Sequence, residues 1–306
     1  MRNFWNLAGI LTAGLMLCGC MSIGEGQKKY PYIIATEQAS TRFLLIDPNI
    51  DPASGKAIVW SWTPEQSMMR GFANPSDAKI VQNGTRLLTA SSGGICALID
   101  IQSGKLLHAL QAGNNPHSAD ILPDGNIVTA ASTGRCVRLF DVKNDPSGKT
   151  FKQYHQDSAH GAVYDDKTGL VYTCGLYGIV AWRYDADKVT LTKEKEYPAP
   201  RKTRYFGGHD LTMDPRNGKL LVSGTEEIYH FDQFTGKYSL YLPLSNVKSI
   251  STLADMPDVD LLQIPTEEWW SDFIRLRDAD GLRPLIRFPG FRFYKARWAE
   301  NVVLGQ

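Results

Sequence analysis

The side chains best suited to bind a ligand recur at matching positions along the 306-residue chain. His117, His160 and His209 each stand directly before a short stretch that is expected to be a strand, and Lys248 holds the same position further on. Neutral imidazoles are nitrogen ligands of metal ions, whereas ammonium groups attract carboxylate, sulfate and phosphate. These four residues therefore predict either an anion site or a metal site to which a carboxylate also binds.

Two further polar residues extend this series, Ser76 before His117 and Lys295 near the end of the chain. Two ammonium groups at one site repel a bare divalent cation. We therefore favour an anion, and keep as the alternative a divalent metal held by the three histidines. Any single histidine is explained as well by bonds to backbone groups and water. Three in the same phase, out of six in the chain, favour a common role.

Aromatic and charged residues between these positions indicate a carbohydrate as the ligand. The candidates are Arg135, Tyr177, Trp269 and Trp270. Aromatic rings stack on the C–H faces of sugars, while polar groups bond the hydroxyls. Neighbouring residues of a strand face opposite sides, so we expect at least one of the two tryptophans at a surface or in a channel. The alternative is that one packs between sheets and the other lies at a sheet edge.

Six repeats position these residues, and each contains an apolar strand that ends in aspartate. These aspartates are Asp47, Asp100, Asp141, Asp185, Asp232 and Asp278, at intervals of 53, 41, 44, 47 and 46 residues. Between them, apolar and polar residues alternate with a period near two, broken by Asn-Gly, Asp-Gly and Ser-Gly pairs. This pattern is typical of short antiparallel strands and tight turns. We expect the aspartate carboxylates to accept backbone N–H groups in the turns that follow.

Repeats of this length with four strands each predict an all-β fold, a six-bladed β-propeller over residues 31–306. The inner strands are expected at 77–81, 118–122, 161–164, 210–213 and 249–253. The first repeat lacks an inner strand, so residues 291–304 must supply it and close the ring. A β-sandwich explains the alternation but not a six-fold phase of aspartates. Because inner strands line one channel, the histidines and lysines are expected to converge at its mouth.

Residues 1–19 have the pattern of a bacterial lipoprotein signal peptide. Arg2 precedes an apolar run over residues 4–17 that is short for a membrane span. Leu17-Cys18-Gly19-Cys20 resembles a lipobox, which makes Cys20 the predicted lipidated N-terminus. An ordinary secretory leader is the alternative. With residues 20–30 as a tether, we expect an exported protein, periplasmic or at the cell surface, anchored to a bacterial membrane by its lipid alone.

The remaining composition excludes several other classes of protein. Lys and Arg number 33 against 32 Asp and Glu, so bulk charge gives no support to nucleic-acid binding. No GxGxxG, GxxxxGK[ST] or GxSxG motif is present. Cys96, Cys136 and Cys174 stand in apolar runs, so we expect buried thiols rather than disulfides. We expect the protein to be a monomer.

The polar motifs together resemble a family of secreted bacterial propellers known only as a domain of unknown function. The motifs are Pro116-His117-Ser118-Ala119-Asp120, Ala159-His160-Gly161, Gly208-His209-Asp210-Leu211, Val247-Lys248-Ser249-Ile250-Ser251 and Trp269-Trp270. The resemblance covers essentially the whole mature chain and implies export, often as a lipoprotein, but no activity. The sequence departs from the family at Ala162-Val163-Tyr164, where a tryptophan is expected.

Three functions remain open from the sequence, which does not decide whether the protein is an enzyme. The first is a propeller that binds a small polar ligand, an anionic sugar, among the histidines and lysines at the channel mouth. The second is a lyase that cleaves a uronate-containing sugar, with His160 or Tyr177 as the base. In it His117 and His209 hold the carboxylate, directly or through a metal, and Lys248 offsets the enolate charge. The analogy to uronate lyases lies at the level of the fold alone. The third is a protein-interaction scaffold.

Overall fold

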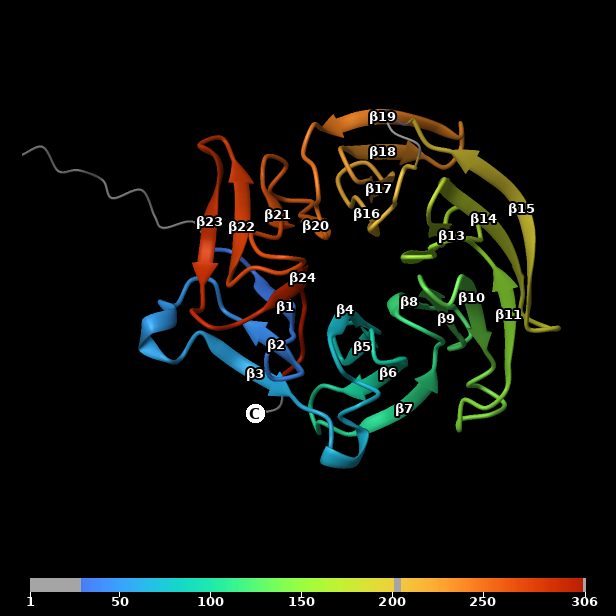
Figure 1. The fold of residues 1–306 in the computed structure, drawn as a ribbon, viewed down its shortest axis with the longest axis horizontal. Coiled ribbons are helices and arrows are strands. Elements are labelled where there is room, and N and C mark those ends of the chain that lie inside the picture. The colour runs from blue at the N-terminus through green and yellow to red at the C-terminus, as the bar shows by residue number, and fades with distance from the viewer. Residues whose placement is uncertain (1–28, 201–204, 305–306) are drawn as a thin grey trace, which may run out of the picture.

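The computed structural model describes residues 29–200 and 205–304, which form six four-stranded antiparallel sheets. Figure 1 shows these sheets standing as blades around a central axis, each with one strand nearest the axis. Neighbouring inner strands contact each other all the way round. The predicted all-β, six-bladed β-propeller is confirmed.

We name the blades A to F and give the strands of each blade in order from the axis outward. The inner strands of blades A to F are β24 (Phe293–Ala299), β4 (Pro75–Val81), β8 (Pro116–Ile121), β12 (Gly161–Asp165), β16 (Asp210–Met213) and β20 (Ser249–Thr252). The second strands are β1 (Tyr32–Glu37), β5 (Arg86–Ser91), β9 (Ile127–Ala131), β13 (Leu170–Cys174), β17 (Leu220–Ser223) and β21 (Asp260–Gln263). The third strands are β2 (Arg42–Ile46), β6 (Ile95–Asp100), β10 (Cys136–Phe140), β14 (Gly178–Asp185), β18 (Ile228–Asp232) and β22 (Phe273–Asp278).

The outer strands are β3 (Ile58–Trp62), β7 (Leu106–Gln111), β11 (Phe151–His155), β15 (Thr190–Pro198), β19 (Lys237–Leu242) and β23 (Gly281–Arg287). Two short 3-10 turns accompany blade A. η1 (Pro52–Ser54) lies between β2 and β3, and η2 (Gln66–Met68) lies between β3 and β4. Each predicted inner strand agrees with the observed one to within two residues.

The last strand closes the ring by joining the first blade, as the sequence predicts. β24 pairs antiparallel with β1, with Tyr32 opposite Ala299 and Ala35 opposite Ala296. The backbone N–H of Lys295 also donates to Oγ1 of Thr36 at 2.9 Å. Closure pairs a sheet edge that would otherwise be open to other chains.

The repeated aspartates hold the turns after the third strands, as predicted. Each of the six carboxylates accepts a backbone N–H two or three residues later, at 2.7 to 3.2 Å. The turn glycines Gly55, Gly104, Gly148 and Gly236 have φ between 68° and 71°, a left-handed conformation that glycine adopts without the Cβ clash of other residues. The regular spacing of aspartates in the sequence therefore reflects one kind of turn that recurs in every blade.

Apolar packing between adjacent blades holds the ring together. The described residues contain six buried apolar clusters, each shared by two neighbouring blades. Inward-facing Leu, Ile and Val side chains contribute roughly 1.5–3 kcal/mol each when fully buried. Cys96, Cys136 and Cys174 are free and buried, as predicted.

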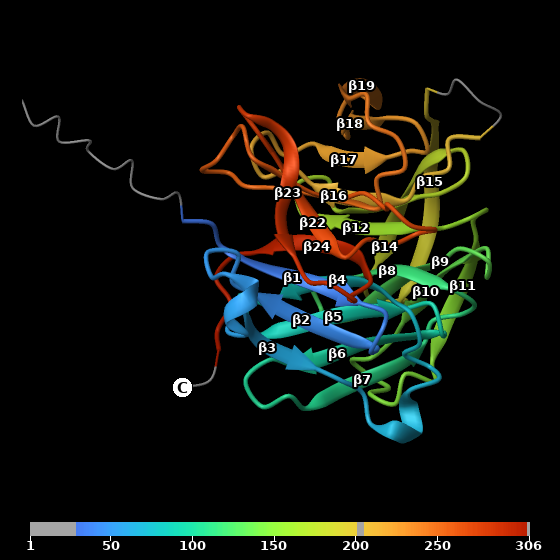
Figure 2. The ribbon, with the colours of Figure 1, turned by 60° about the vertical axis from the view of Figure 1, so that its left-hand side comes forward.

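All inner strands begin at one end of the channel, which we call the mouth, and end at the far face. Two contacts align the strand starts: the hydroxyl of Ser76 donates to the carbonyl of Pro116 at 2.6 Å, and Nζ of Lys295 reaches the carbonyl of His117 at 3.2 Å. Figure 2 shows the ring tilted, with β1 beside β24. Tyr30 stacks on Trp298, near the far end of β24, with ring centroids 5.7 Å apart. The chain therefore enters the ring at the far face.

The predicted signal peptide, Cys20 and most of the tether lie outside the described residues. Within residues 29–200 and 205–304, no helix has the length and apolar character needed to cross a membrane.

Candidate functional site

A left-handed residue precedes the mouth position in five of the six blades, always by two places. These residues and their φ angles are Asn74 (51°), Asn115 (58°), Ser158 (51°), Gly207 (62°) and Asn246 (57°). Asparagine and glycine tolerate this conformation best among common residues. The same backbone turn therefore places Ser76, His117, His160, His209 and Lys248 at equivalent points of the ring.

This turn also fixes the tautomer of two histidines. Nδ1 of His160 lies 2.8 Å from the carbonyl oxygen of Ser158, and Nδ1 of His209 lies 2.7 Å from that of Gly207. A carbonyl oxygen only accepts hydrogen bonds, so both Nδ1 atoms carry the proton and both Nε2 atoms keep a lone pair. Neither Nε2 has a hydrogen-bond partner in the described part of the chain. Each is available to accept a hydroxyl proton.

The three imidazoles form one contact series at the mouth. The ring of His117 stacks on that of His160 at 4.4 Å between centroids and 18° between planes, and the ring of His209 follows at 5.3 Å. On its other side, His117 meets Tyr294, whose hydroxyl lies 3.2 Å from Nδ1. The predicted convergence of the three histidines is therefore present in the structure.

All three histidines are neutral at physiological pH. Burial, together with repulsion from Lys248 and Lys295, lowers the pKa of His160 to about 4 and that of His209 to about 3. Burial, His160 and Lys295 likewise hold the pKa of His117 well below its usual range. The mouth therefore owes its positive charge to lysine rather than to imidazolium.

Inside the channel, two cations of β24 neutralise two buried carboxylates. Nζ of Lys295 donates to Asp210 at 3.0 Å, and the guanidinium of Arg297 bonds Asp210 at 2.6 Å and Asp77 at 2.8 Å. Burial opposes ionisation of both aspartates, but Arg297 and Lys295 outweigh it and lower their pKa values. Lys295 is almost fully buried, so it lies beneath the mouth as part of this network.

Lys248 differs from Lys295 in having no carboxylate partner among the residues that the structure describes. It is only 8% exposed, and no hydrogen bond or ion pair joins its Nζ to any residue that the structure describes. Burial, together with the charge of Lys295, lowers the pKa of Lys248 to about 8. At neutral pH this ammonium is charged, poorly hydrated and without a counter-ion, which is the condition under which it binds an anion most strongly.

Lys248 and His117 open into one pocket of about 290 Å³, which we call the mouth pocket. Its walls come from blades A, B, C and F, through Gln38, Asn74, Ser92, Asn115, His117, Lys248, Trp269 and Tyr294. Trp269 is 43% exposed, and its indole N–H donates to Oε1 of Gln38 at 2.9 Å. The pocket thus combines one ammonium, several amide and hydroxyl groups and an exposed aromatic ring.

The other predicted site residues lie elsewhere. Ser76 is fully buried, with its hydroxyl bonded to the carbonyl of Pro116. Arg135 forms an exposed ion pair with Asp157 at 2.6 Å. Trp270 lies under the guanidinium of Arg292, at 4.9 Å, outside the mouth pocket. Both tryptophans belong to the connection between β21 and β22 rather than to a strand, so the strand argument for their orientation does not apply.

Tyr177, named from the sequence as a base, lines a different pocket from His117 and Lys248. Nor do the histidines form a metal centre: the described residues contain no group of three or more His, Cys, Asp or Glu side chains that suits a metal ion. The rings of His117 and His160 lie in nearly parallel planes with centroids 4.4 Å apart, so their in-plane lone pairs do not meet at one point. The geometry therefore favours an anion over a metal ion as the ligand of this site.

Sequence reasoning missed Gln38 and the left-handed asparagines, and it did not predict the contact of Tyr294 with His117. The asparagines carry a signal that is visible in retrospect, because Asn74, Asn115 and Asn246 stand in one phase of the repeat. Tyr294 carries none, since its place beside His117 depends on the pairing of β24 with β1.

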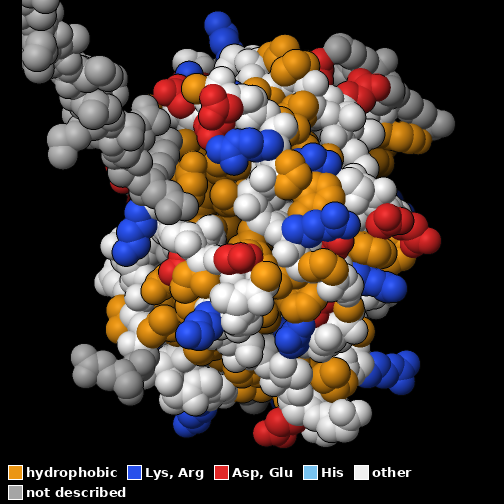
Figure 3. Space-filling model, turned by 90° about the vertical axis from the view of Figure 1, so that its left-hand side faces the viewer, with side chains coloured by type: hydrophobic (Ala, Val, Ile, Leu, Met, Phe, Trp, Pro, Cys, Tyr) orange, Lys and Arg blue, Asp and Glu red, His pale blue; other side chains and the backbone are white. Residues whose placement is uncertain are grey.

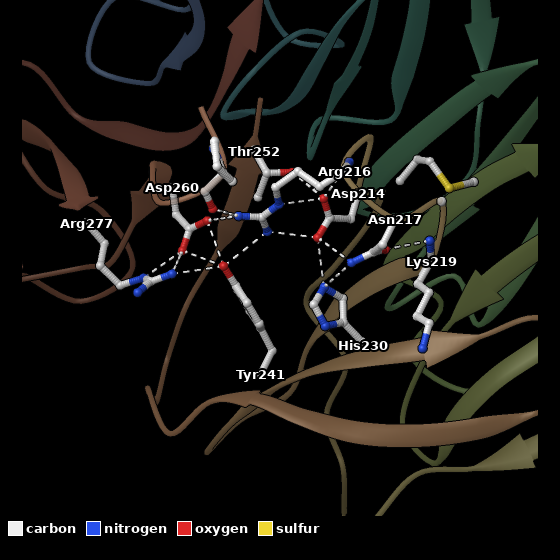
Figure 4. A network of polar contacts seen from close by, with 12 residues as sticks. Asp214, Arg216, Asn217, Lys219, His230, Tyr241, Thr252, Asp260 and Arg277 are labelled. Atoms are coloured by element: carbon white, nitrogen blue, oxygen red, sulfur yellow. Dashed lines mark hydrogen bonds and ion pairs between the residues drawn. The ribbon is translucent and has the colours of Figure 1, made fainter. Parts of the chain in front are cut away.

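A second polar network lies at the far face, between blades E and F (Figure 4). Asp214 bonds Arg216 and His230 at 2.8 Å, and Asp260 bonds Arg277 at 2.6 Å. The hydroxyl of Tyr241 joins the two halves by contacting both Asp260 and Arg216. Each of its two carboxylates is matched by an arginine, so this network stabilises the contact between the blades.

Figure 3 shows the outer surface on the side of blades A and F. Apolar side chains are interspersed there with basic and acidic ones, without a patch of a single charge. This side of the ring therefore gives no specific support to a scaffold role.

Comparison with known proteins extends the sequence resemblance. No curated protein matches the chain. The solved structures that are similar include Kuenenia stuttgartiensis hydrazine synthase, at 12% identity, TM-score 0.49, and coverage of 69% of this chain and 65% of that one. Another is the dihydro-heme d1 dehydrogenase NirN, at 14% identity, TM-score 0.49, and coverage of 85% and 54%. The chain thus spans about two thirds and about half of their lengths. A model of a family of unknown function (DUF6528) matches residues 27–304, and the chain belongs to that family.

Proposed function

We propose that the protein binds a small anionic sugar in the mouth pocket. The observation that carries this proposal is the ammonium of Lys248, charged, 8% exposed and without a counter-ion among the described residues. A carboxylate beside it would supply the missing charge. The exposed face of Trp269 offers a stacking surface for the sugar ring in the same pocket.

The neutral histidines favour a sugar over a simple inorganic anion. His160 and His209 present acceptor nitrogens, which repel anions but accept hydroxyl protons. His117 and the amides of Asn74 and Asn115 add further polar groups around the pocket. A ligand with one carboxylate and several hydroxyls matches this set of groups better than sulfate or phosphate does.

We propose further that the protein is exported and held at a bacterial membrane through lipid on Cys20. The apolar leader and the lipobox-like Leu17-Cys18-Gly19-Cys20 support this proposal. Because the chain joins the ring at the far face, beside Trp298, an anchor at this end would leave the mouth open on the other side.

A lyase is the second candidate, favoured by the contact between Tyr294 and His117 in the mouth pocket. A phenol that bonds an imidazole is suited to transfer a proton at a sugar carbon beside a carboxylate. When the proton leaves that carbon, the bond from the neighbouring carbon to the oxygen of the next sugar breaks, and the departing sugar takes up a proton. The product is an unsaturated uronate, so the ultraviolet absorbance rises as the reaction proceeds. A rise that disappears in Tyr294→Phe would establish the lyase.

The binding proposal is tested with matched pairs of sugars that differ only in one carboxylate. The thermal midpoint of the protein from residue 22 is measured with galacturonate against galactose and with glucuronate against glucose. Ligand at about 100 times its Kd stabilises by roughly 2.7 kcal/mol, which is visible as a shift. We expect a shift with a uronate that its neutral parent does not give and that Lys248→Met removes. Equal shifts with both members of each pair, or none with any sugar, would contradict the proposal.

A further inference from the structure

A second pocket opens on the same face of the ring, between blades C and D. It has a volume of about 230 Å³ and lies between the end of β11, the loop from β13 to β14, and the end of β15. The Tyr177 loop joins the second and third strands of its blade, as the Trp269 loop does in blade F. The pocket beside Tyr177 and the mouth pocket are therefore neighbours on one surface.

A short series of contacts connects the two pockets. Asp157 lines the pocket beside Tyr177, and its neighbour Ser158 bonds His160. His160 in turn stacks on His117, which lines the mouth pocket, at 4.4 Å. The backbone from residue 157 to 160 spans at most about 11 Å. One extended ligand can therefore reach both pockets.

The chemistry of the second pocket suits a sugar ring rather than a second anion. Tyr177 is 49% exposed, and its ring lies 6.1 Å from that of Tyr205. The charged side chains are already paired, Asp157 with Arg135 and Lys193 with Glu196. The pocket thus carries balanced charge, hydrogen-bonding groups and an exposed aromatic face, but no counterpart of Lys248.

We infer that the ligand is an oligosaccharide, with an acidic residue in the mouth pocket and a further sugar residue against Tyr177. This inference rests on the proposed function and specifies its ligand class. Tyr177 is then a second stacking platform, separated from Trp269 by the histidine series. The Nε2 atoms of His160 and His209 are the acceptors for hydroxyls of the intervening sugar.

The test compares ligands of different length by isothermal titration. Galacturonate and glucuronate are used as the monomer and as the 1,4-linked dimer and tetramer. We expect the tetramer to bind about tenfold or more tightly than the monomer, and Tyr177→Ala to reduce its affinity to that of the monomer. Phe234→Ala is the matched control, because Phe234 is 72% exposed in the turn between β18 and β19, at the far face. It should bind every ligand as the wild type does.

Three outcomes separate the inference from the proposal beneath it. A length-dependent gain that is lost in Tyr177→Ala and kept in Phe234→Ala supports both. Equal affinity for monomer and tetramer, or a gain that survives Tyr177→Ala, overturns the oligosaccharide inference and leaves the binding proposal standing. Absence of binding by every monomer and oligomer overturns both. Circular dichroism of each variant shows that the fold is retained.

Discussion

Lys295 lies beneath the channel mouth that Lys248 lines, and of the two only Lys295 has a carboxylate partner in the part of the chain that the structure describes. Nζ of Lys295 lies 3.0 Å from Asp210, whereas Lys248 faces the mouth pocket without a counter-ion. Lys295 therefore stabilises the fold, whereas Lys248 costs stability until an anion binds beside it. This difference can be measured in the absence of any ligand.

Lys248→Met is expected to stabilise the unliganded protein at pH 7. The pKa of Lys248 is lowered from 10.5 to about 8, so the folded state penalises its charged form. The penalty is complete below pH 8, falls as the pH rises and is gone above about 10.5, with an upper size of about 3 kcal/mol. Urea unfolding at several pH values measures it. Lys105→Met, in an exposed turn, is the control, and a loss of stability in Lys248→Met would refute this account.

Affinity for a uronate is expected to stay constant between pH 5 and 7 and to fall about tenfold per pH unit above about 8. Binding needs the ammonium of Lys248, whose pKa is about 8 in the free protein. The histidines are already neutral throughout this range. Titration calorimetry across this pH range measures the affinity for the uronate. A fall in affinity between pH 5 and 7 would show that imidazolium, rather than ammonium, binds the anion.

Asp210→Asn is expected to destabilise the protein by about 3–5 kcal/mol, because it leaves Lys295 and Arg297 with only Asp77. Adding Lys295→Met should recover part of the loss, which a double-mutant cycle measures. The lowered pKa values of Asp77 and Asp210 mean that the stability of this network is present above about pH 4 and lost as the pH falls further. Simple additivity of the two substitutions would show that the groups are not coupled.

Asn246→Gly is expected to preserve both stability and binding, whereas Asn246→Ala should cost about 1–2 kcal/mol and weaken binding. The reason is the φ of 57° at Asn246, which glycine adopts freely and alanine adopts only with strain. Thermal unfolding and uronate titration of the two variants measure the effects. Equal behaviour of both variants would mean that this backbone turn does not position Lys248.

Cys20→Ser is expected to abolish incorporation of labelled palmitate in a bacterial host and to release the protein from the membrane fraction. The lipobox-like sequence makes Cys20 the acceptor. Cys96→Ser is a suitable control, because Cys96 is a buried thiol within the ring. Continued labelling of Cys20→Ser would place the lipid elsewhere or exclude it.

The repeated features of the molecule were predictable from the sequence, and the unrepeated ones were not. The aspartate turns and the inner strands recur, so each repeat reinforces the next, and even the closing strand follows from the gap in the first repeat. The pairing of Lys295 with Asp210 joins residues 85 positions apart across the channel. No local pattern shows that Lys295 is paired and Lys248 is not.

The same reasoning explains which site residues were placed correctly. The phase of the repeat brought His117, His160 and His209 together. Loop residues have no such phase, so Trp269 and Tyr177 appeared equivalent in the sequence although they line separate pockets. Loop length and conformation, which differ from blade to blade, decide how far each side chain reaches toward the axis.

The closing strand also determines when the site comes into existence. Tyr294, Lys295 and Arg297 all lie on β24, which pairs with a strand more than 250 residues earlier. During synthesis, Asp77 and Asp210 therefore remain without their cations, and β1 without its neighbour, until the final residues emerge. Contacts of such long sequence separation form slowly. Ring closure, charge neutralisation in the channel and the ability to bind a ligand are thus a single late event, which a chain truncated before residue 293 never reaches.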